Sequence, residues 1–228
     1  MRLSKWPIAL LAATVAILTA WYFTARSEQS GSAKVPTLRE TTNLDRLVRP
    51  HSPIFGPHDA PVTIVEFFDP ACEACRAFYP IVKDLLARHP EDVRLVLRYA
   101  PFHQGADKIV RVLEASKAQG QYWQVLEALL NTQPMWADHS RPPDFDLALR
   151  AAEQAGLDLK QAQADAVTPE MDALIRQEMD DLIALKIEKT PTFFINGERL
   201  TAFSVQDLTD IVAEKVMKAK EVGVSADN

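Results

Sequence analysis

The feature that most constrains this chain is a pair of cysteines separated by two residues, Cys72 and Cys75. They are the only cysteines among the 228 residues. The segment before them, Val62–Phe68, consists mostly of apolar and β-branched residues and is typical of a buried strand. A helix is predicted from about Cys72 to Arg88. The pair is therefore expected at a turn where a strand ends and a helix begins.

Two thiols at this spacing can close into a small disulfide and reopen by exchange with another protein. A structural disulfide, by contrast, stabilises a fold mainly by closing a long loop of the unfolded chain. A bridge across two residues closes almost no loop, and two inert, reduced cysteines would not suit an oxidising compartment. The sequence therefore favours a redox-active pair.

Length and charge narrow the remaining classes of protein. A chain of 228 residues allows one domain, or one domain with an insertion. The hydrophobic content of 47% and the charged content of 25% are those of an ordinary globular protein. The net charge of −6 provides no basic surface, so nucleic acid is not an expected partner.

Residues 1–26 predict a signal anchor that spans the membrane. After Arg2 and Lys5, residues 6–25 carry no charge and are long enough to cross a hydrocarbon core. They end in a Trp-Tyr-Phe cluster suited to the membrane interface. A cleaved signal peptide is the alternative, but Phe23 would occupy the −3 position of the cleavage site. Both interpretations place the cysteines outside a bacterial cytoplasm, where disulfides persist.

Three further segments complete the expected domain organisation. Residues 27–58 contain Ser-Gly-Ser and four prolines and are predicted to be a tether, whose later part either extends freely or lies against the domain. The folded domain is expected over residues 59–220. Residues 221–228 are expected to be a frayed tail.

The predicted elements follow the order β-α-β, a block of helices, then a β-hairpin and a helix. The second strand is Val93–Tyr99, and helical patterns occupy about 104–187. The expected helices of this block are Ile109–Ala115, Tyr122–Leu130, Phe145–Ala155 and Pro169–Ile187. The last of them begins with a capping hydroxyl, Thr168, followed by a proline at the first helical position.

The C-terminal part of the chain predicts a hairpin and a last helix. The strand Thr192–Ile195 leads into Asn196-Gly197, a strong signal for a two-residue turn, with 198–201 as the return strand. Ser204, with Asp207 three residues later, indicates the start of a helix that runs to about Lys220.

This order of elements, with four local matches, resembles the thioredoxin superfamily and, within it, the DsbA-like thiol:disulfide oxidoreductases. The matches are Glu66-Phe67-Phe68 before the cysteines, the Cys72-x-x-Cys75 pair, Pro80 five residues after it, and Thr190-Pro191-Thr192 before a strand. The resemblance covers Pro61 to Lys220. It implies an α/β thioredoxin-like fold with a helical insertion at about 104–187, between the β-α-β and β-β-α halves. The segment at residues 1–26 adds one expected transmembrane helix before this fold.

The two cysteines are expected to have different roles. Cys72, at the start of a helix, meets unpaired N–H groups and the positive end of the helix dipole, which favour its thiolate. We expect Cys72 to be the nucleophile and Cys75, one turn further in, to be more buried and to resolve the mixed disulfide. Glu73 and Ala74 tune the pair. The Glu73 carboxylate should raise the pKa of Cys72 and give a disulfide less oxidising than that of the family archetype, unless it only complements the helix N-terminus.

The resemblance implies roles for residues outside the cysteine motif. The acid at the place of Glu66 lies beneath the cysteines and relays protons to the second one; the alternative is a solvated strand-edge glutamate. Arg98 stands where the family carries a basic partner of this acid, or it faces solvent on the strand. Pro191 is expected to be cis, so that the backbone of Thr190 lies beside Cys72 and can pair with an extended substrate chain.

No metal site or cofactor is expected. The five histidines lack metal-ligand spacing and are expected in loops or on the surface, among them His103 and His139. A thiolate pair can hold Cu(I), which makes a copper-handling protein one alternative function. No methionine-rich or histidine-rich stretch accompanies the pair.

The sequence thus predicts a thiol:disulfide oxidoreductase anchored in the bacterial inner membrane, with its catalytic domain in the periplasm. The expected substrates are extracytoplasmic proteins with thiols or disulfides, with oxidation of dithiols favoured and reduction as the alternative. A membrane partner, DsbB-like for oxidation or DsbD-like for reduction, would reset the pair. We expect a monomer, because the tether is too short to form a dimerisation domain.

Overall fold

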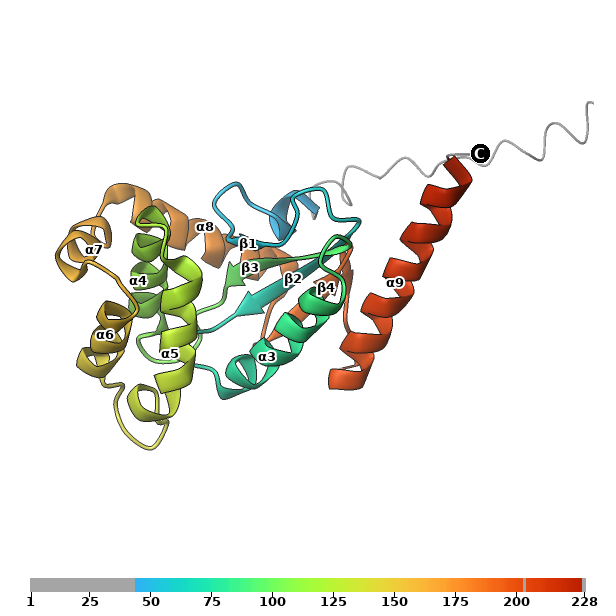
Figure 1. Ribbon diagram of the computed structural model, residues 1–228. Coiled ribbons are helices and arrows are strands. Elements are labelled where there is room, and N and C mark those ends of the chain that lie inside the picture. The colour runs from blue at the N-terminus through green and yellow to red at the C-terminus, as the bar shows by residue number, and fades with distance from the viewer. Residues whose placement is uncertain (1–43, 203, 227–228) are drawn as a thin grey trace, which may run out of the picture. The chain divides into compact units, whose positions relative to one another are not determined.

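The computed structural model describes residues 44–202 and 204–226, in which a five-stranded sheet has helices on both faces (Figure 1). The strands are β1 (Ile54–Phe55), β2 (Val62–Phe68), β3 (Val93–Tyr99), β4 (Thr192–Ile195) and β5 (Glu198–Arg199). Their order in the sheet is β1-β3-β2-β4-β5. β2 and β3 run parallel, whereas the other neighbouring strands are antiparallel.

The first half of the fold follows the predicted β-α-β order. β2 and β3 have the predicted bounds, and α3 (Glu73–Arg88) connects them, with Cys72 as its N-cap. β2 lies between β3 and β4, which explains its apolar character on both faces. The start of α3 therefore lies at the C-terminal end of the central strand, β2.

Five helices lie between β3 and β4, as the fold class predicts: α4 (Ala106–Ala118), α5 (Tyr122–Trp136), α6 (Phe145–Gln154), α7 (Leu159–Asp165) and α8 (Pro169–Leu185). Of these, α4–α7 form a lobe at the left of Figure 1. The Thr168 Oγ1 atom accepts from the Met171 N–H at 3.2 Å, so the predicted cap of α8 is confirmed. α7 was not predicted, because seven residues are too few to show a helical repeat.

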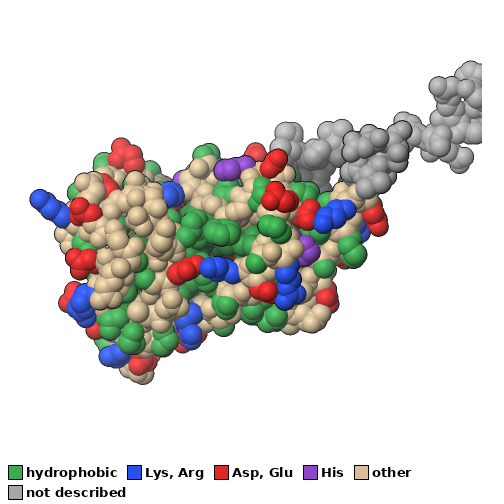
Figure 2. Space-filling model, in the orientation of Figure 1, with side chains coloured by type: hydrophobic (Ala, Val, Ile, Leu, Met, Phe, Trp, Pro, Cys, Tyr) green, Lys and Arg blue, Asp and Glu red, His purple; other side chains and the backbone are tan. Residues whose placement is uncertain are grey.

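The two faces of the sheet carry separate groups of apolar side chains. Alternate residues of β2 and β3 point to opposite faces because of the pleat. On one face the strands pack against α3 and α9 (Val205–Ala226), and that core continues into α4 and α5. On the other face Val65 and Phe67 pack against Leu182 of α8 and against Leu47. Figure 2, in the same orientation as Figure 1, shows charged side chains of both signs around exposed apolar side chains.

The later part of the predicted tether lies against the domain. Leu47 is buried, and β1 pairs with β3 through Ile54 and Val96. At the other end, α9 continues to Ala226, beyond the predicted end at Lys220. The anchor predicted at residues 1–26 lies outside the described residues. Within 44–202 and 204–226, no helix is both long and apolar enough to cross a membrane.

The hairpin of the second half has the predicted turn. Asn196 and Gly197 both have positive φ, 49° and 86°, as a type I′ turn requires. The return strand is shorter than predicted, since β5 ends at Arg199. Ser204 accepts from the Asp207 N–H at 3.0 Å, which confirms the predicted start of the last helix.

Candidate active site

The two cysteines occupy the N-terminus of α3 and differ in exposure. Cys72 is 6% exposed, whereas Cys75, one turn further along the helix, is fully buried. Both are free thiols. The Cys75 Sγ atom accepts a hydrogen bond from the Asp69 N–H at 3.4 Å. Cys72 is therefore the sulfur nearer the surface, and Cys75 is the more buried of the two, as expected.

The loop before β4 lies beside Cys72. β4 runs antiparallel to β2, with Thr192 opposite Phe67. The residues preceding β4 therefore lie next to the C-terminal end of β2, close to the start of α3. The Thr190–Pro191 peptide bond is cis, as predicted. The Cys72 thiol donates to the Thr190 carbonyl oxygen, with an Sγ–O distance of 3.5 Å. The backbone of Thr190 thus flanks the sulfur.

The surroundings of the two thiols shift their pKa values in opposite directions. A hydrogen bond from Cys75 lowers the pKa of Cys72 to about 5. The Thr190 side chain and the N–H groups of Cys75 and Ala74 act in the same direction, against the effect of burial. Burial raises the pKa of Cys75 well above its usual value, and its hydrogen bond to Cys72 and the charge of Glu66 add to the rise. At neutral pH the reduced pair therefore holds a thiolate on Cys72 and a proton on Cys75.

Glu66 is buried on the face of β2 that packs against α3. Glu66 is 1% exposed, and neither of its carboxylate oxygens has a hydrogen-bond partner within the described part of the chain. Burial raises the pKa of Glu66 to about 8, with a smaller contribution from the charge of Cys72. Glu66 is therefore protonated at neutral pH. The alternative of a solvated, strand-edge glutamate is wrong, because β2 is central in the sheet.

Arg98 does not pair with Glu66, and it does not face solvent. In β3 it lies opposite Phe67 and shares that residue's face of the sheet, whereas Glu66 points to the other face. The Arg98 guanidinium is fully buried and donates to Glu178 at 3.1 Å and to Asp181 at 2.9 Å, both in α8. Both sequence interpretations of Arg98 are therefore wrong.

Asp69 holds the turn that leads into α3, a role that the sequence analysis missed. One carboxylate oxygen accepts from the Ala71 N–H at 2.8 Å. The other accepts from the N–H groups of Phe102 and His103 at 2.7 and 2.9 Å and contacts the His103 ring at 2.8 Å. Asp69 thus links the cysteine loop to the segment after β3. An acid directly after a buried strand was the available signal.

Gln133 of α5 holds the same turn from the insertion. It is fully buried, and its Nε2 atom donates to the carbonyl oxygens of Pro70 and Cys72 at 2.8 and 3.0 Å. Its Oε1 atom accepts from Arg76 at 3.0 Å. The sequence analysis missed Gln133 because the helix was expected to end at Leu130; a polar residue on the apolar side of α5 was the signal.

Of the two residues between the cysteines, only Glu73 projects from the surface. Ala74 is half-buried against the core. The Glu73 side chain is 61% exposed, and its Oε2 atom lies 3.1 Å from the His139 Nε2 atom. His139 and His103, both in loops as expected, line a cavity of about 80 Å³ together with Ala71. No group of three or more side chains suited to a metal ion exists in residues 44–202 and 204–226.

Comparisons with known proteins agree with this geometry. A family model described as thioredoxin matches residues 49–220. A thioredoxin-like oxidoreductase from Silicibacter pomeroyi is 31% identical, with a TM-score of 0.65 over 78% of this chain and 97% of that one. The fold is shared with BdbD from Bacillus subtilis (21% identity, 73% and 94% coverage, TM-score 0.63) and alpha-DsbA1 from Wolbachia pipientis (19%, 78% and 96%, 0.68).

The chain also matches one segment of each of several longer proteins. The chain is 33% identical over 208 residues to a Na(+)/H(+) antiporter NhaA 3 from Salinispora tropica, a match that covers 86% of this chain and 30% of the antiporter. An antiporter NhaA from Herminiimonas arsenicoxydans is 31% identical over 147 residues, with 64% and 22% coverage. The chain thus spans less than a third of the length of these relatives.

The family match covers most of the folded domain, including β2, the cysteine pair and the loop that carries the cis peptide bond. The Silicibacter oxidoreductase is matched over nearly its whole length. The chain belongs to the thioredoxin family.

Proposed function

We propose that Cys72 and Cys75 exchange disulfides with extracytoplasmic proteins and that oxidation of substrate dithiols is the favoured direction. The supporting observation is the lowering of the Cys72 pKa to about 5 in the reduced protein. A thiolate that is stabilised in the reduced form makes the disulfide easier to reduce, and so a stronger oxidant. A pKa of about 5 lies between roughly 3.5 for DsbA and roughly 7 for thioredoxin. We therefore expect an intermediate potential.

The exchange proceeds in two displacements. A substrate thiolate attacks the Cys72 sulfur, the Cys72–Cys75 bond breaks, and Cys75 leaves as a thiolate. Because the pKa of Cys75 is raised, this thiolate takes up a proton, and protonated Glu66 beneath it is the proposed donor. A second substrate thiolate then attacks the substrate sulfur of the mixed disulfide and releases Cys72 as its thiolate. The substrate gains a disulfide as the enzyme gains two reduced cysteines.

The backbone beside the sulfur supports a broad choice of protein substrates. The carbonyl oxygen of Thr190 lies 3.5 Å from Cys72 and is presented by the cis Thr190–Pro191 bond. An extended chain that pairs with this backbone would place its cysteine next to Cys72 without depending on its other side chains. We propose Thr190 and Pro191 as the substrate-pairing residues.

The proposed location is the periplasmic side of the bacterial inner membrane. Residues 1–26 would form a single-pass anchor, and the domain would act as a monomer on proteins with free thiols. In the oxidising direction, a DsbB-like membrane protein would remove the electrons from the reduced pair. In the reducing direction, a DsbD-like protein would supply them.

Equilibration of the purified domain with glutathione, followed by assays in both directions, tests the proposal. We expect the oxidised protein to form disulfides in a reduced, unfolded test protein, with loss of turnover in Cys72→Ser. Cys75→Ser should instead trap mixed disulfides. Efficient insulin reduction without oxidation of the test protein would assign the protein as a reductase. Tight stoichiometric Cu(I) binding without turnover in either direction would assign it to copper handling.

A further inference from the structure

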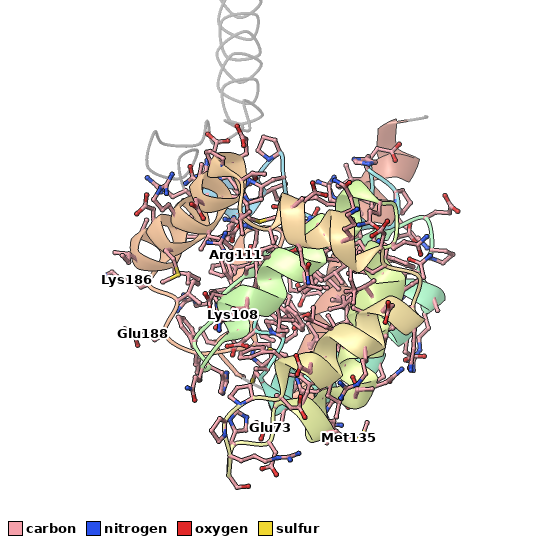
Figure 3. All side chains as sticks on the ribbon, turned by 90° about the vertical axis from the view of Figure 1, so that its left-hand side faces the viewer. Glu73, Lys108, Arg111, Met135, Lys186 and Glu188 are labelled. Carbon is pink, nitrogen blue, oxygen red and sulfur yellow. The ribbon has the colours of Figure 1, made fainter. Side chains whose placement is uncertain are left out.

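The carboxylate next to the nucleophile has a histidine as its partner. Glu73 directly follows Cys72, and its Oε2 atom lies 3.1 Å from the His139 Nε2 atom. His139 belongs to the segment between α5 and α6, more than sixty positions along the chain, so the contact is a tertiary one. In Figure 3 Glu73 lies near the lower end of the view, below the labelled cations Lys108, Arg111 and Lys186.

His139 is held in place from its other side. Its ring packs against that of His103, with 4.7 Å between ring centroids. The His103 Nδ1 atom lies 2.8 Å from Asp69, whose other oxygen holds the Ala71 N–H. Asp69, His103, His139 and Glu73 therefore form a connected series of titratable side chains around the loop that carries Cys72.

Charged or titratable groups surround His139 from three segments of the chain. On its own loop, Asp138 and Arg141 lie 3.6 Å apart as an exposed ion pair and largely offset each other. His103 and, behind it, Asp69 face it from the segment after β3, and Glu73 faces it from α3. Histidine is the side chain that gains or loses charge near physiological pH. Protonation of His139 thus changes the charge that accompanies Glu73 beside the thiolate.

We propose that His139 is a positioning residue for the disulfide exchange, which holds the Glu73 carboxylate and, when protonated, offsets its charge beside Cys72. The inference rests on the proposed exchange function. A carboxylate near a thiolate disfavours the thiolate, and a cation paired with that carboxylate weakens the effect. The reduced form is therefore stabilised more when His139 is protonated than when it is neutral. The redox potential of the pair then depends on pH through this contact.

The test is a double-mutant cycle on the contact. The equilibrium constant between the protein disulfide and two glutathione molecules, giving the dithiol and glutathione disulfide, is measured at about pH 5.5 and about pH 8, on either side of the usual histidine pKa. The proteins are the wild type, His139→Gln, Glu73→Gln and the double variant, with His58→Gln as the control. The His58 side chain is exposed and distant in sequence from this loop.

We expect His139→Gln to lower this constant about two- to fivefold at the lower pH and to leave it unchanged at the higher pH, as for a solvent-exposed charge pair. In the Glu73→Gln background, the effect of His139→Gln should fall to half or less. An equal change at both pH values, no change beyond that of His58→Gln, or an undiminished effect without Glu73 would each overturn the proposal. If the wild type does not equilibrate with glutathione at all, the exchange function itself fails instead.

Discussion

Glu66 combines a polar side chain with one of the most apolar positions in the fold. Burial raises its pKa to about 8, and its two oxygens have no hydrogen-bond partner among the described residues. Isolated carboxylates of this kind are costly when ionised and persist at sites where proton transfer matters. It lies on the face of β2 that packs against α3, and its charge adds to the raised pKa of the buried Cys75.

The raised pKa predicts how stability changes with pH. The folded protein keeps a proton on Glu66 that the unfolded chain releases above about pH 4.5. The stability from this group is complete below that pH and is lost as pH rises through about 8. Glu66→Gln removes the titration, so we expect the variant to be more stable than the wild type by about 1–3 kcal/mol at neutral pH and equal to it near pH 4. Urea unfolding of the reduced proteins at both pH values measures the difference.

The matched control is Glu153→Gln, an exposed glutamate of α6. Its stability should follow that of the wild type at both pH values. Glu66→Gln should also slow the uptake of a proton by Cys75 and with it the formation of the mixed disulfide. A Glu66→Gln variant that is no more stable at neutral pH than at pH 4, relative to the wild type, would show that Glu66 is ionised in the folded protein.

Residues within local motifs could be predicted from the sequence, whereas their tertiary partners could not. Cys72, Cys75 and the cis Thr190–Pro191 bond are marked by short patterns at fixed spacing. The partner of Arg98 was predicted wrongly, because the pleat of β3 turns it away from Glu66 and towards α8. The partner of Glu73 lies on a distant loop, and nothing in the spacing indicates it.

At the scale of elements, α5 and α3 are linked through the turn that carries Cys72. The Gln133 side chain of α5 donates hydrogen bonds to two carbonyl oxygens of this turn, those of Pro70 and Cys72. It also accepts from Arg76, one turn after Cys72. The helical insertion therefore supports the geometry of the redox loop as well as the core.

Gln133→Leu keeps the size of the side chain but removes its hydrogen bonds. It leaves two buried carbonyl oxygens and the Arg76 guanidinium without this partner, so we expect a loss of about 1–3 kcal/mol in unfolding free energy. The exposed Gln163→Leu of α7 is the control and should change stability by less than about 0.5 kcal/mol. If Gln133 positions the loop, the titration of the Cys72 thiolate, followed by ultraviolet absorbance, should also shift in Gln133→Leu. An unchanged titration would limit Gln133 to a structural role.

Element boundaries were predictable where hydrophobic periodicity or a cap marks them. β2, β3 and β4 have the predicted bounds, and the cap of α8 was visible as Thr168 followed by a proline. α7 and the extra turn of α5 depend on packing, which a local pattern does not contain. β1 is only two residues long, and its pairing with β3 is fixed by the fold.

At the scale of the molecule, the segment before β1 is joined to α8 by a buried cluster of charges. Arg46 and Arg49 donate to Asp181 at 2.7 Å, next to the contact of Arg98 with the same carboxylate. His51 contacts Glu178 beside them. The segment at 44–58 therefore belongs to the packed domain.

Asp181 makes this cluster sensitive to the loss of one partner. Burial alone would raise its pKa, but hydrogen bonds from Arg49 and Arg98, with Arg46, lower the pKa to about 2. A lowered pKa contributes stability above the unfolded value of 3.8, and this stability is lost as the pH falls through about 2. Asp181 therefore depends on the arginines of the N-terminal segment as well as on Arg98, whereas Glu178 contacts Arg98 and His51.

Arg49→Gln tests whether this segment stabilises the whole domain. It removes two hydrogen bonds to a fully buried carboxylate, so we expect a loss of about 2–4 kcal/mol in unfolding free energy at neutral pH. The loss should shrink as the pH falls below about 4, because Asp181 then becomes protonated in the variant. Arg88→Gln, whose partner Asp84 is exposed, is the control and should cost less than about 1 kcal/mol. Equal losses for the two variants in urea unfolding would mean that the N-terminal segment only rests on the domain, and that the domain proper begins at β1.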